Sequence, residues 1–298
     1  MPSTREVRRR IRSTKNMAQV TKSMQMVASS KMRRAQERVQ QARPYSEQIY
    51  SFVSRLANAT GDDLGEGVAL LKQRPVRNIG LIVITPDRGL CGALPSNINR
   101  KADATAREQQ NRLAEQGERP GVEYIAVGRK IRDYVIRLGY NMMAEFVNYG
   151  DKPSLSDATA IAQVAVDAFL KGEVDAVYLV YAKFVNAITQ VPTAVQLLPV
   201  QPPTEEQNQD ERKAIEYIYE PDARSIFEAL LPRYVDVQVY QAMLEAVASE
   251  QSAKFTAMKN ATDNANELIQ DLTLAYNKAR QASITTQILE VVAGAAAL

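Results

Sequence analysis

The chain has 298 residues, of which 45% are hydrophobic and 24% are charged, and its formal net charge is +3. It contains no histidine, no tryptophan and a single cysteine, Cys91. This composition excludes a Ser-His-Asp triad, a histidine-assisted cysteine nucleophile, a histidine-ligated zinc site and any disulfide within the chain.

Glycine and proline, the residues that most strongly interrupt regular structure, are concentrated in the middle of the chain. Before Gly61 only Pro2 and Pro44 occur, and from Arg233 to Ala293 there is neither residue. We therefore expect a long helix at each end, and the two helices are expected to pair as an antiparallel coiled coil. The predicted division is an N-terminal helix, an α/β domain and a C-terminal helix, at residues 1–60, 75–220 and 221–298.

The N-terminal helix carries apolar or small residues at alternating spacings of three and four. Such heptad spacing is typical of a helix that packs along another helix. Pro44 is expected to bend this helix or to break it locally. The predicted seam consists of Met17, Val20, Met24, Val27, Ala35, Val39, Ala42, Ile49, Val53 and Leu56.

The same segment is strongly basic, because residues 1–43 hold twelve Lys or Arg against Glu6 and Glu37. Three interpretations stay open: an arm that follows nucleic-acid phosphates, a helix that faces acidic loops of a partner protein, and a solvated helix face. The absence of aromatic residues before Tyr45 counts against stacking on bases. The basic residues form two groups: Arg8, Arg9, Arg10, Arg12 and Lys15, then Lys31, Arg33, Arg34 and Arg38.

The middle of the chain alternates short β-branched or aromatic runs with helical stretches. This alternation predicts a Rossmann-like α/β domain with a parallel sheet. The proline-dotted segment Gln190–Val200 is expected at an edge of that sheet. The predicted strands are Asn78–Thr85, Val122–Val127, Met142–Tyr149 and Ala176–Tyr181, and the predicted helices are Leu94–Gln116, Arg129–Leu138 and Ser156–Lys171.

The turn after the first predicted strand, Thr85–Gly92, lies where a dinucleotide-binding fingerprint would be found. It reads TPDRGLCG, which is neither GxGxxG nor GxxxxGK[ST], so no phosphate-binding loop is expected. An enzyme built on Cys91 as a thiolate would lack a histidine base, and a small half-buried residue is the favoured interpretation. We predict no active site and no cofactor.

The C-terminal helix also shows heptad spacing, but polar Gln251, Thr262 and Ser283 interrupt its seam. Two interpretations remain: a modestly stable coiled coil, or a shaft whose outer surfaces also contact other subunits. Apolar runs such as Val291–Leu298 are too short to span a bilayer, which takes roughly 18 residues. The predicted seam is Tyr240, Leu244, Val247, Phe255, Met258, Ala265, Ile269, Leu272, Tyr276 and Ala279.

Several motifs, in order along the chain, resemble the γ-subunit family of F-type ATP synthases. They are IRSTKNMAQVTKSMQMVASSKMRRAQ near the N-terminus, TPDRGLCG and KFVNAITQVPTAVQLLP in the middle, YEPD at residues 219–222, and the whole stretch Ala248–Leu298. The resemblance covers essentially the entire chain.

The resemblance implies a central rotor shaft that turns inside the alpha3beta3 hexamer and couples proton flow to ATP synthesis, with no catalytic groups of its own. It implies alpha and beta subunits, an epsilon subunit and the c-ring as partners, and no nucleic acid. It places the chain on the cytoplasmic face of a bacterial cell membrane, peripherally, with the c-ring as its only link to the membrane. A nucleic-acid-binding arm on an α/β domain is the alternative.

The resemblance also assigns contacts to individual residues. The residues expected to contact a beta subunit are Met24, Arg88, Arg280, Gln281 and Thr285. Those expected near the c-ring and epsilon are Tyr217 and Glu220, and those expected in an apolar sleeve of the hexamer are Val291, Val292 and Leu298. Gln287 stands where the family usually has a glutamate, so a carboxylate contact there is in doubt.

Overall fold

The structure is a computed structural model that describes residues 4–60, 69–114, 120–201 and 223–296. The chain divides into two compact units, one made of Met1–Ser30 with Lys254–Leu298 and the other of Lys31–Ala253. Two long helices, α1 (Thr4–Thr60) and α6 (Ala223–Ala296), contribute a segment to each unit.

The unit Lys31–Ala253 is built on a five-stranded sheet whose strand order is β3-β2-β1-β4-β5. The first four strands are mutually parallel, and β5 pairs with β4 in the antiparallel direction. The predicted parallel sheet and the predicted edge strand are therefore confirmed. The strands are β1 (Asn78–Ile84), β2 (Gly121–Val127), β3 (Asn141–Phe146), β4 (Ala176–Phe184) and β5 (Gln190–Leu198).

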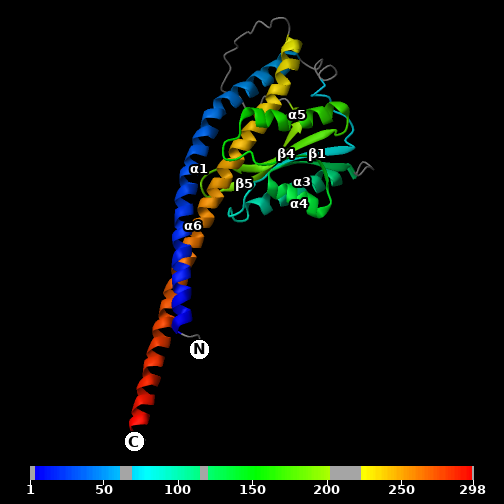
Figure 1. Cartoon of the computed structure of the whole chain (residues 1–298). Coiled ribbons are helices and arrows are strands. Elements are labelled where there is room, and N and C mark those ends of the chain that lie inside the picture. Colours follow the sequence, from blue (N-terminus) through cyan, green and yellow to red (C-terminus); the bar gives the residue numbers. More distant parts are fainter. Residues whose placement is uncertain (1–3, 61–68, 115–119, 202–222, 297–298) are drawn as a thin grey trace. The chain divides into compact units, whose positions relative to one another are not determined.

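Helices cover both faces of this sheet (Figure 1), and the alternation of side chains along the strands fills a core on each side. On one face, Leu81 and Val83 of β1 pack with α3 (Leu94–Ala114) and α4 (Arg129–Leu138). On the other face, Ile82 packs with α5 (Leu155–Lys171) and with α6.

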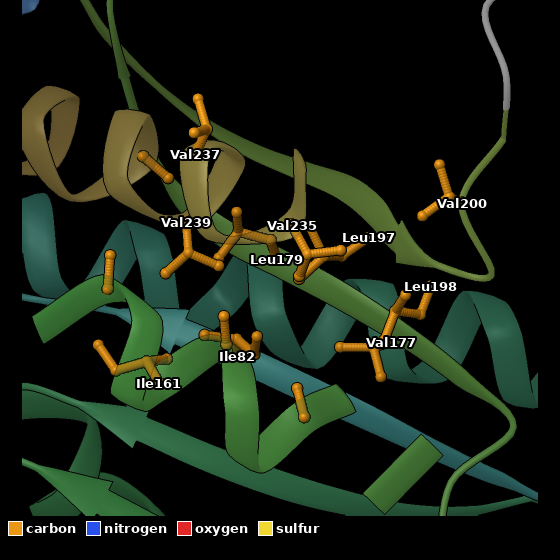
Figure 2. Close-up of a cluster of buried hydrophobic side chains, with 14 of the residues drawn as sticks. Ile82, Ile161, Val177, Leu179, Leu197, Leu198, Val200, Val235, Val237 and Val239 are labelled. Atoms are coloured by element: carbon orange, nitrogen blue, oxygen red, sulfur yellow. The ribbon is translucent and has the colours of Figure 1, made fainter. Parts of the chain in front are cut away.

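The core on the second face joins the α/β layer to the long helices. Figure 2 shows Val235 and Val239 of α6 beside Leu179 of β4 and Leu197 of β5. All four side chains are at most 3% exposed. Because α6 supplies part of this core, its segment Ala223–Ala253 belongs to the same folded body as the sheet.

Local signals in the sequence set the helix boundaries. Ser154 and Asp157 form a reciprocal capping box at the start of α5, and hydrogen bonds from Ser154 lower the pKa of the Asp157 carboxyl. Gly139 and Gly172 end α4 and α5 in the left-handed conformation.

The two prolines in the long helices do not end them. Helix α1 continues through Pro44 from Thr4 to Thr60, so of the two predicted effects of Pro44, a bend or a local break, the break does not occur. Helix α6 starts at Ala223 and passes Pro232, ahead of the stretch without glycine or proline. Both prolines are exposed, and each removes only one helical hydrogen bond. The helices continue because neighbouring parts of them are held by packing, with Val53 and Phe227 completely buried.

Candidate interface on the helix pair

In the unit Met1–Ser30 with Lys254–Leu298, segments of α1 and α6 pack as an antiparallel pair. Arg8 contacts Tyr276 and Thr21 contacts Thr262, so a later residue of α1 meets an earlier residue of α6. The residues buried between the helices are small or polar for the most part: Val7, Ala18, Thr21 and Ala28 of α1, and Met258, Thr262 and Ala265 of α6. The antiparallel coiled coil is thereby confirmed.

The predicted seam holds for α6 but is wrong for the start of α1. Met17, Val20 and Val27 are 59%, 55% and 56% exposed, and Met24 is half-buried. The buried positions lie one residue further along, at Ala18, Thr21 and Ala28, because small side chains let two helix backbones approach closely. We call Met17, Val20, Met24 and Val27 the outer apolar stripe; their spacing of three and four places them on one side of α1.

Two polar contacts hold the helices of this pair together. The hydroxyls of Thr21 and Thr262 lie 2.8 Å apart in the buried seam. Arg8 donates to the Tyr276 hydroxyl at 2.5 Å, and its guanidinium lies 5.4 Å from the centre of that ring. Thr262 is one of the polar residues that interrupt the predicted seam. At this position the polar side chain forms a hydrogen bond across the seam, to Thr21.

Some of the basic residues have partners within the chain. Arg10 pairs with Glu6 at 2.9 Å. In the unit Lys31–Ala253, Lys31 and Arg38 both donate to Asp151. Basic residues of the first group stay exposed along α1, namely Arg9, Arg12 and Lys15.

Beyond the level where α1 begins, α6 continues as a single helix. From Arg280 to Val292 every side chain that the structure describes is exposed, including those of Gln281 and Thr285. Thr285 donates to the backbone oxygen of Gln281. Large apolar side chains are exposed in the same stretch, which is typical of an interaction surface: Ile284 at 48%, Ile288 at 57%, Leu289 at 63%, Val291 at 72% and Val292 at 58%.

Met24 and Arg280 lie at different levels of the helix pair. Arg8 is level with Tyr276, so Arg280 lies close to the start of α1. At 1.5 Å per residue, the distance along α1 from Arg8 to Met24 is roughly 24 Å. The predicted contact residues of this unit therefore form two groups: Met24 on the outer apolar stripe, and Arg280, Gln281 and Thr285 on the single-helix end.

Arg88 belongs to the other unit, where it is exposed in the turn after β1. The carboxylate of the preceding residue, Asp87, fixes this turn by accepting from the backbone N–H of Arg129 at 3.0 Å and of Asn148 at 2.9 Å. Cys91 is 1% exposed, and its thiol faces the backbone oxygen of Arg88 at 3.7 Å. Cys91 was expected to be a small half-buried residue, and it is buried more completely than that.

A further hydrogen bond joins the carboxyl end of β1 to the loop after β3. The N-terminus of α4, which could hold a phosphate, already receives the carboxylate of Asp87. The backbone oxygen of Thr85 accepts from the Tyr149 hydroxyl at 2.8 Å, and burial raises the pKa of that hydroxyl. These bonds tie the end of β1 to the start of α4 and to the loop after β3.

One cavity of about 300 Å³ lies at the opposite ends of the strands, between α3, β2 and the start of β3. Its lining includes Asp103, Tyr124 and Tyr140, and the two tyrosine rings stack with their centres 5.3 Å apart. Among the described residues there is no group of three or more His, Cys, Asp or Glu side chains that could hold a metal ion. Among the described residues there is also no helix that is both long enough and apolar enough to cross a bilayer.

Three of the predicted contact residues, Tyr217, Glu220 and Leu298, lie outside the described residues. The outer apolar stripe was found by heptad spacing but assigned to the wrong side of the helix. The exposure of Leu90, in the turn beside Arg88, was not predicted from the sequence, because a single apolar residue in a loop has no periodic pattern.

Comparison with known proteins identifies the family. The family model described as ATP synthase matches residues 3–298. An "ATP synthase gamma chain" from Roseiflexus castenholzii is 48% identical over 300 residues, with 100% of this chain and 99% of the relative covered. The chain belongs to the ATP synthase gamma-chain family. A relative with the same description from Dehalococcoides mccartyi is 47% identical, and both chains are covered completely.

Solved structures of this family share the fold. A chain of the Tetrahymena thermophila mitochondrial ATP synthase central stalk and c-ring structure matches with a TM-score of 0.56 and 25% identity, covering 81% of this chain and 99% of that one. A chain of the Euglena gracilis mitochondrial ATP synthase structure matches with a TM-score of 0.64 and 21% identity, covering 99% and 94%. The predicted fold, a coiled coil of the terminal helices with a Rossmann-like α/β domain, is confirmed.

Proposed function

We propose that this gamma-family chain is the central rotor shaft of an F1Fo ATP synthase. It turns inside the alpha3beta3 hexamer and couples transmembrane proton flow to ATP synthesis. The observation that carries the proposal is the single-helix end of α6, which exposes apolar side chains such as Val291 and Leu289. Burying one such side chain contributes about 1.5–3 kcal/mol, so this end is suited to an apolar sleeve in a larger assembly.

The shaft acts by its orientation and carries no catalytic group. A shaft that presents a different side to each of three beta subunits interacts differently with each, and this difference shifts which beta conformation is lowest in energy. The turn after β1 reads TPDRGLCG, which is not a phosphate-binding sequence, and this supports a subunit that does not itself bind nucleotide. Family membership favours this function over a nucleic-acid-binding arm.

The proposed contacts lie on the outer apolar stripe of α1, on the single-helix end of α6 and in the turn after β1. Met24, Arg88, Arg280, Gln281 and Thr285 would contact beta subunits, where the guanidinium groups can form paired hydrogen bonds with carboxylates. The helical ends 1–60 and 221–298 would form the shaft, and the domain 75–220 would lie outside the hexamer. Tyr217 and Glu220 would face the c-ring and epsilon, and Val291, Val292 and Leu298 would occupy the sleeve.

The proposed location is the cytoplasmic face of a bacterial cell membrane, where the chain is peripheral and reaches the membrane only through the c-ring. Alpha, beta and epsilon subunits and the c-ring are the proposed partners. Neither a cofactor nor nucleic acid is part of the proposal.

Assembly with alpha and beta subunits tests the proposal. We expect the chain to form an alpha3beta3gamma particle that hydrolyses ATP, whereas the chain alone should show no turnover. In that particle, Arg280→Ala or Gln281→Ala should lower hydrolysis roughly tenfold, the effect of losing a hydrogen bond to a charged group. Thr286→Ala is the matched control, because Thr286 is exposed on the other side of α6 and bonds only to its own helix.

The outcomes separate the possibilities. Unchanged helicity in the Arg280 and Gln281 variants, together with reduced hydrolysis, supports the contact assignment. Absence of a particle under conditions where alpha and beta fold would refute the rotor function. Salt-dependent binding of the chain to duplex or single-stranded nucleic acid would favour the alternative.

A further inference from the structure

Helix α6 carries a row of buried polar side chains on the segment that packs against the sheet. Glu245 is 8% exposed, Gln251 is 1% exposed, and Ser249 and Ser252 are fully buried. The neighbouring positions of this segment, such as Leu244 and Val247, are apolar and equally buried. Polar groups in such a place require hydrogen-bond partners, and each of these four has one.

Three of the four contact the hairpin formed by β4 and β5. Ser249 donates to the backbone oxygen of Ala182 at 2.9 Å, and Ser252 donates to that of Ala187 at 2.5 Å. The Glu245 carboxylate accepts from the backbone N–H of Phe184 at 3.3 Å. In addition, the Gln190 amide donates to the Ser252 hydroxyl at 3.0 Å.

The fourth, Gln251, contacts the loop after β3 through Asp151. One carboxylate oxygen of Asp151 accepts from the Gln251 amide at 3.1 Å, and the other accepts from Lys31 of α1 at 2.5 Å. The backbone oxygen of Asp151 accepts from Arg38 of α1 at 2.9 Å. One residue of the α/β domain is thus bonded to both long helices.

These contacts fix α6 in a way that apolar packing does not. Apolar surfaces attract without direction, whereas a hydrogen bond weakens steeply when its atoms move out of line. A rotation of α6 by roughly 30° about its axis would move a side-chain atom at a radius of about 5 Å by roughly 2.6 Å. Such a shift would break every one of these bonds.

Stability alone does not account for the arrangement. The Lys31 and Asp151 side chains are 40% and 43% exposed, and ion pairs in such positions contribute little to folding. Polar residues at buried helix positions are best known for fixing register rather than for adding stability.

We propose that Glu245, Ser249, Gln251, Ser252 and Asp151, here termed the polar lock, transmit torque between the sheet and the segments of α1 and α6 that belong to the same unit. The inference rests on the proposed rotor function, in which the α/β domain faces the c-ring and the helices face the hexamer. The lock residues touch no substrate; they are positioning residues that keep α6 from turning or sliding relative to the sheet.

The test uses the complete ATP synthase in sealed vesicles, with ATP hydrolysis and ATP-driven proton pumping measured on the same preparation. Two variants remove lock contacts: the double variant Ser249→Ala with Ser252→Ala, and Lys31→Glu. In both we expect ATP hydrolysis to continue, while the number of protons pumped per ATP falls about threefold or more, as coupling between contacting residues predicts. The exchanged pair, Lys31→Glu with Asp151→Lys, should recover part of the pumping, because it restores the ion pair but not the carboxylate that accepts from Gln251. Asp133→Ala, which breaks the exposed Arg132–Asp133 pair on α4, is the matched control.

The ratio of pumping to hydrolysis is the decisive readout, because a purely structural defect would lower both rates together. An unchanged ratio in the serine double variant and in Lys31→Glu, or no recovery in the exchanged pair, overturns the polar lock. If the parent chain does not assemble with alpha and beta subunits, both the rotor function and the polar lock are refuted. If the parent enzyme assembles and pumps, but the variants pump as many protons per ATP as the parent, only the polar lock is refuted.

Discussion

Replacement of Gly128 by alanine tests the hydrogen-bonded cluster that positions the Arg88 turn. Gly128 has φ +99° and ψ 149°, a region that only glycine occupies readily. A Cβ at this position would lie 1.9 Å from the backbone oxygen of Thr85. That oxygen also accepts from the Tyr149 hydroxyl, and the Gly128 N–H donates to Phe146 at 2.7 Å.

The magnitude follows from these contacts. Backbone strain at such a φ and ψ costs about 1–3 kcal/mol. Relief of the clash requires Thr85 and Gly128 to separate by about 1 Å or more, and the loss of a buried hydrogen bond that results costs about 1–3 kcal/mol. We expect Gly128→Ala to lower the free energy of unfolding by about 4 kcal/mol. Gly139→Ala should cost only about 1 kcal/mol, because Gly139 also has a positive φ (+68°) but no atom near its missing Cβ.

Native-state hydrogen exchange on the full chain is the appropriate assay, since a chain with two compact units need not unfold in a single step. The free energy of opening would be read from the amides of β1 and β2 in the parent, Gly128→Ala and Gly139→Ala. Equal losses in the two variants would show that the contact with Thr85 does not matter and would refute the reasoning.

Two further predictions concern the helix pair and the tyrosines. Thr21→Val or Thr262→Val alone should weaken the pair by about 1 kcal/mol, because either change removes the bond between the two hydroxyls and leaves the remaining hydroxyl bonded only within its own helix. The double variant should lose less than the sum of the two single losses; additive losses in exchange of the flanking amides would contradict this. Burial raises the pKa of Tyr134 and Tyr234 to about 12. The folded chain therefore holds protons that the unfolded chain releases above pH 10. The contribution of these tyrosines to stability in urea should be constant from pH 7 to pH 10 and should be lost between pH 10 and 12; stability of Tyr234→Phe should fall less over that range, and an equal fall would count against burial as the cause.

The α/β domain was predictable because its signals are local. The run 79–84 is apolar and buried at every position, as strands covered on both faces must be, and glycines or capping residues separate such runs from helices. The edge position of β5 followed from Pro192, which cannot donate a ladder hydrogen bond. These features depend on neighbouring residues alone.

The register of the α1 seam was not predictable by the same logic. The rule of burying the larger apolar side chain selects Met17, Val20 and Val27, but the structure buries Ala18, Thr21 and Ala28. The decision depends on how closely the α6 backbone approaches, and that distance is set by residues more than two hundred positions away. The Thr21–Thr262 bond is likewise invisible until the two helices are paired.

The exposed apolar residues and the buried polar residues of the long helices both depart from what local sequence preference predicts. A chain that folded for its own stability would bury the outer apolar stripe and Val291, and would place apolar residues at Ser249 and Gln251. This chain does the opposite: it exposes apolar side chains on its helices and buries hydrogen-bonded polar ones where α6 meets the sheet. Conflicts between local preference and placement are expected where function sets the residue. In the proposed rotor, other subunits would cover the exposed apolar residues, and the buried polar ones would hold the helices in one orientation relative to the sheet.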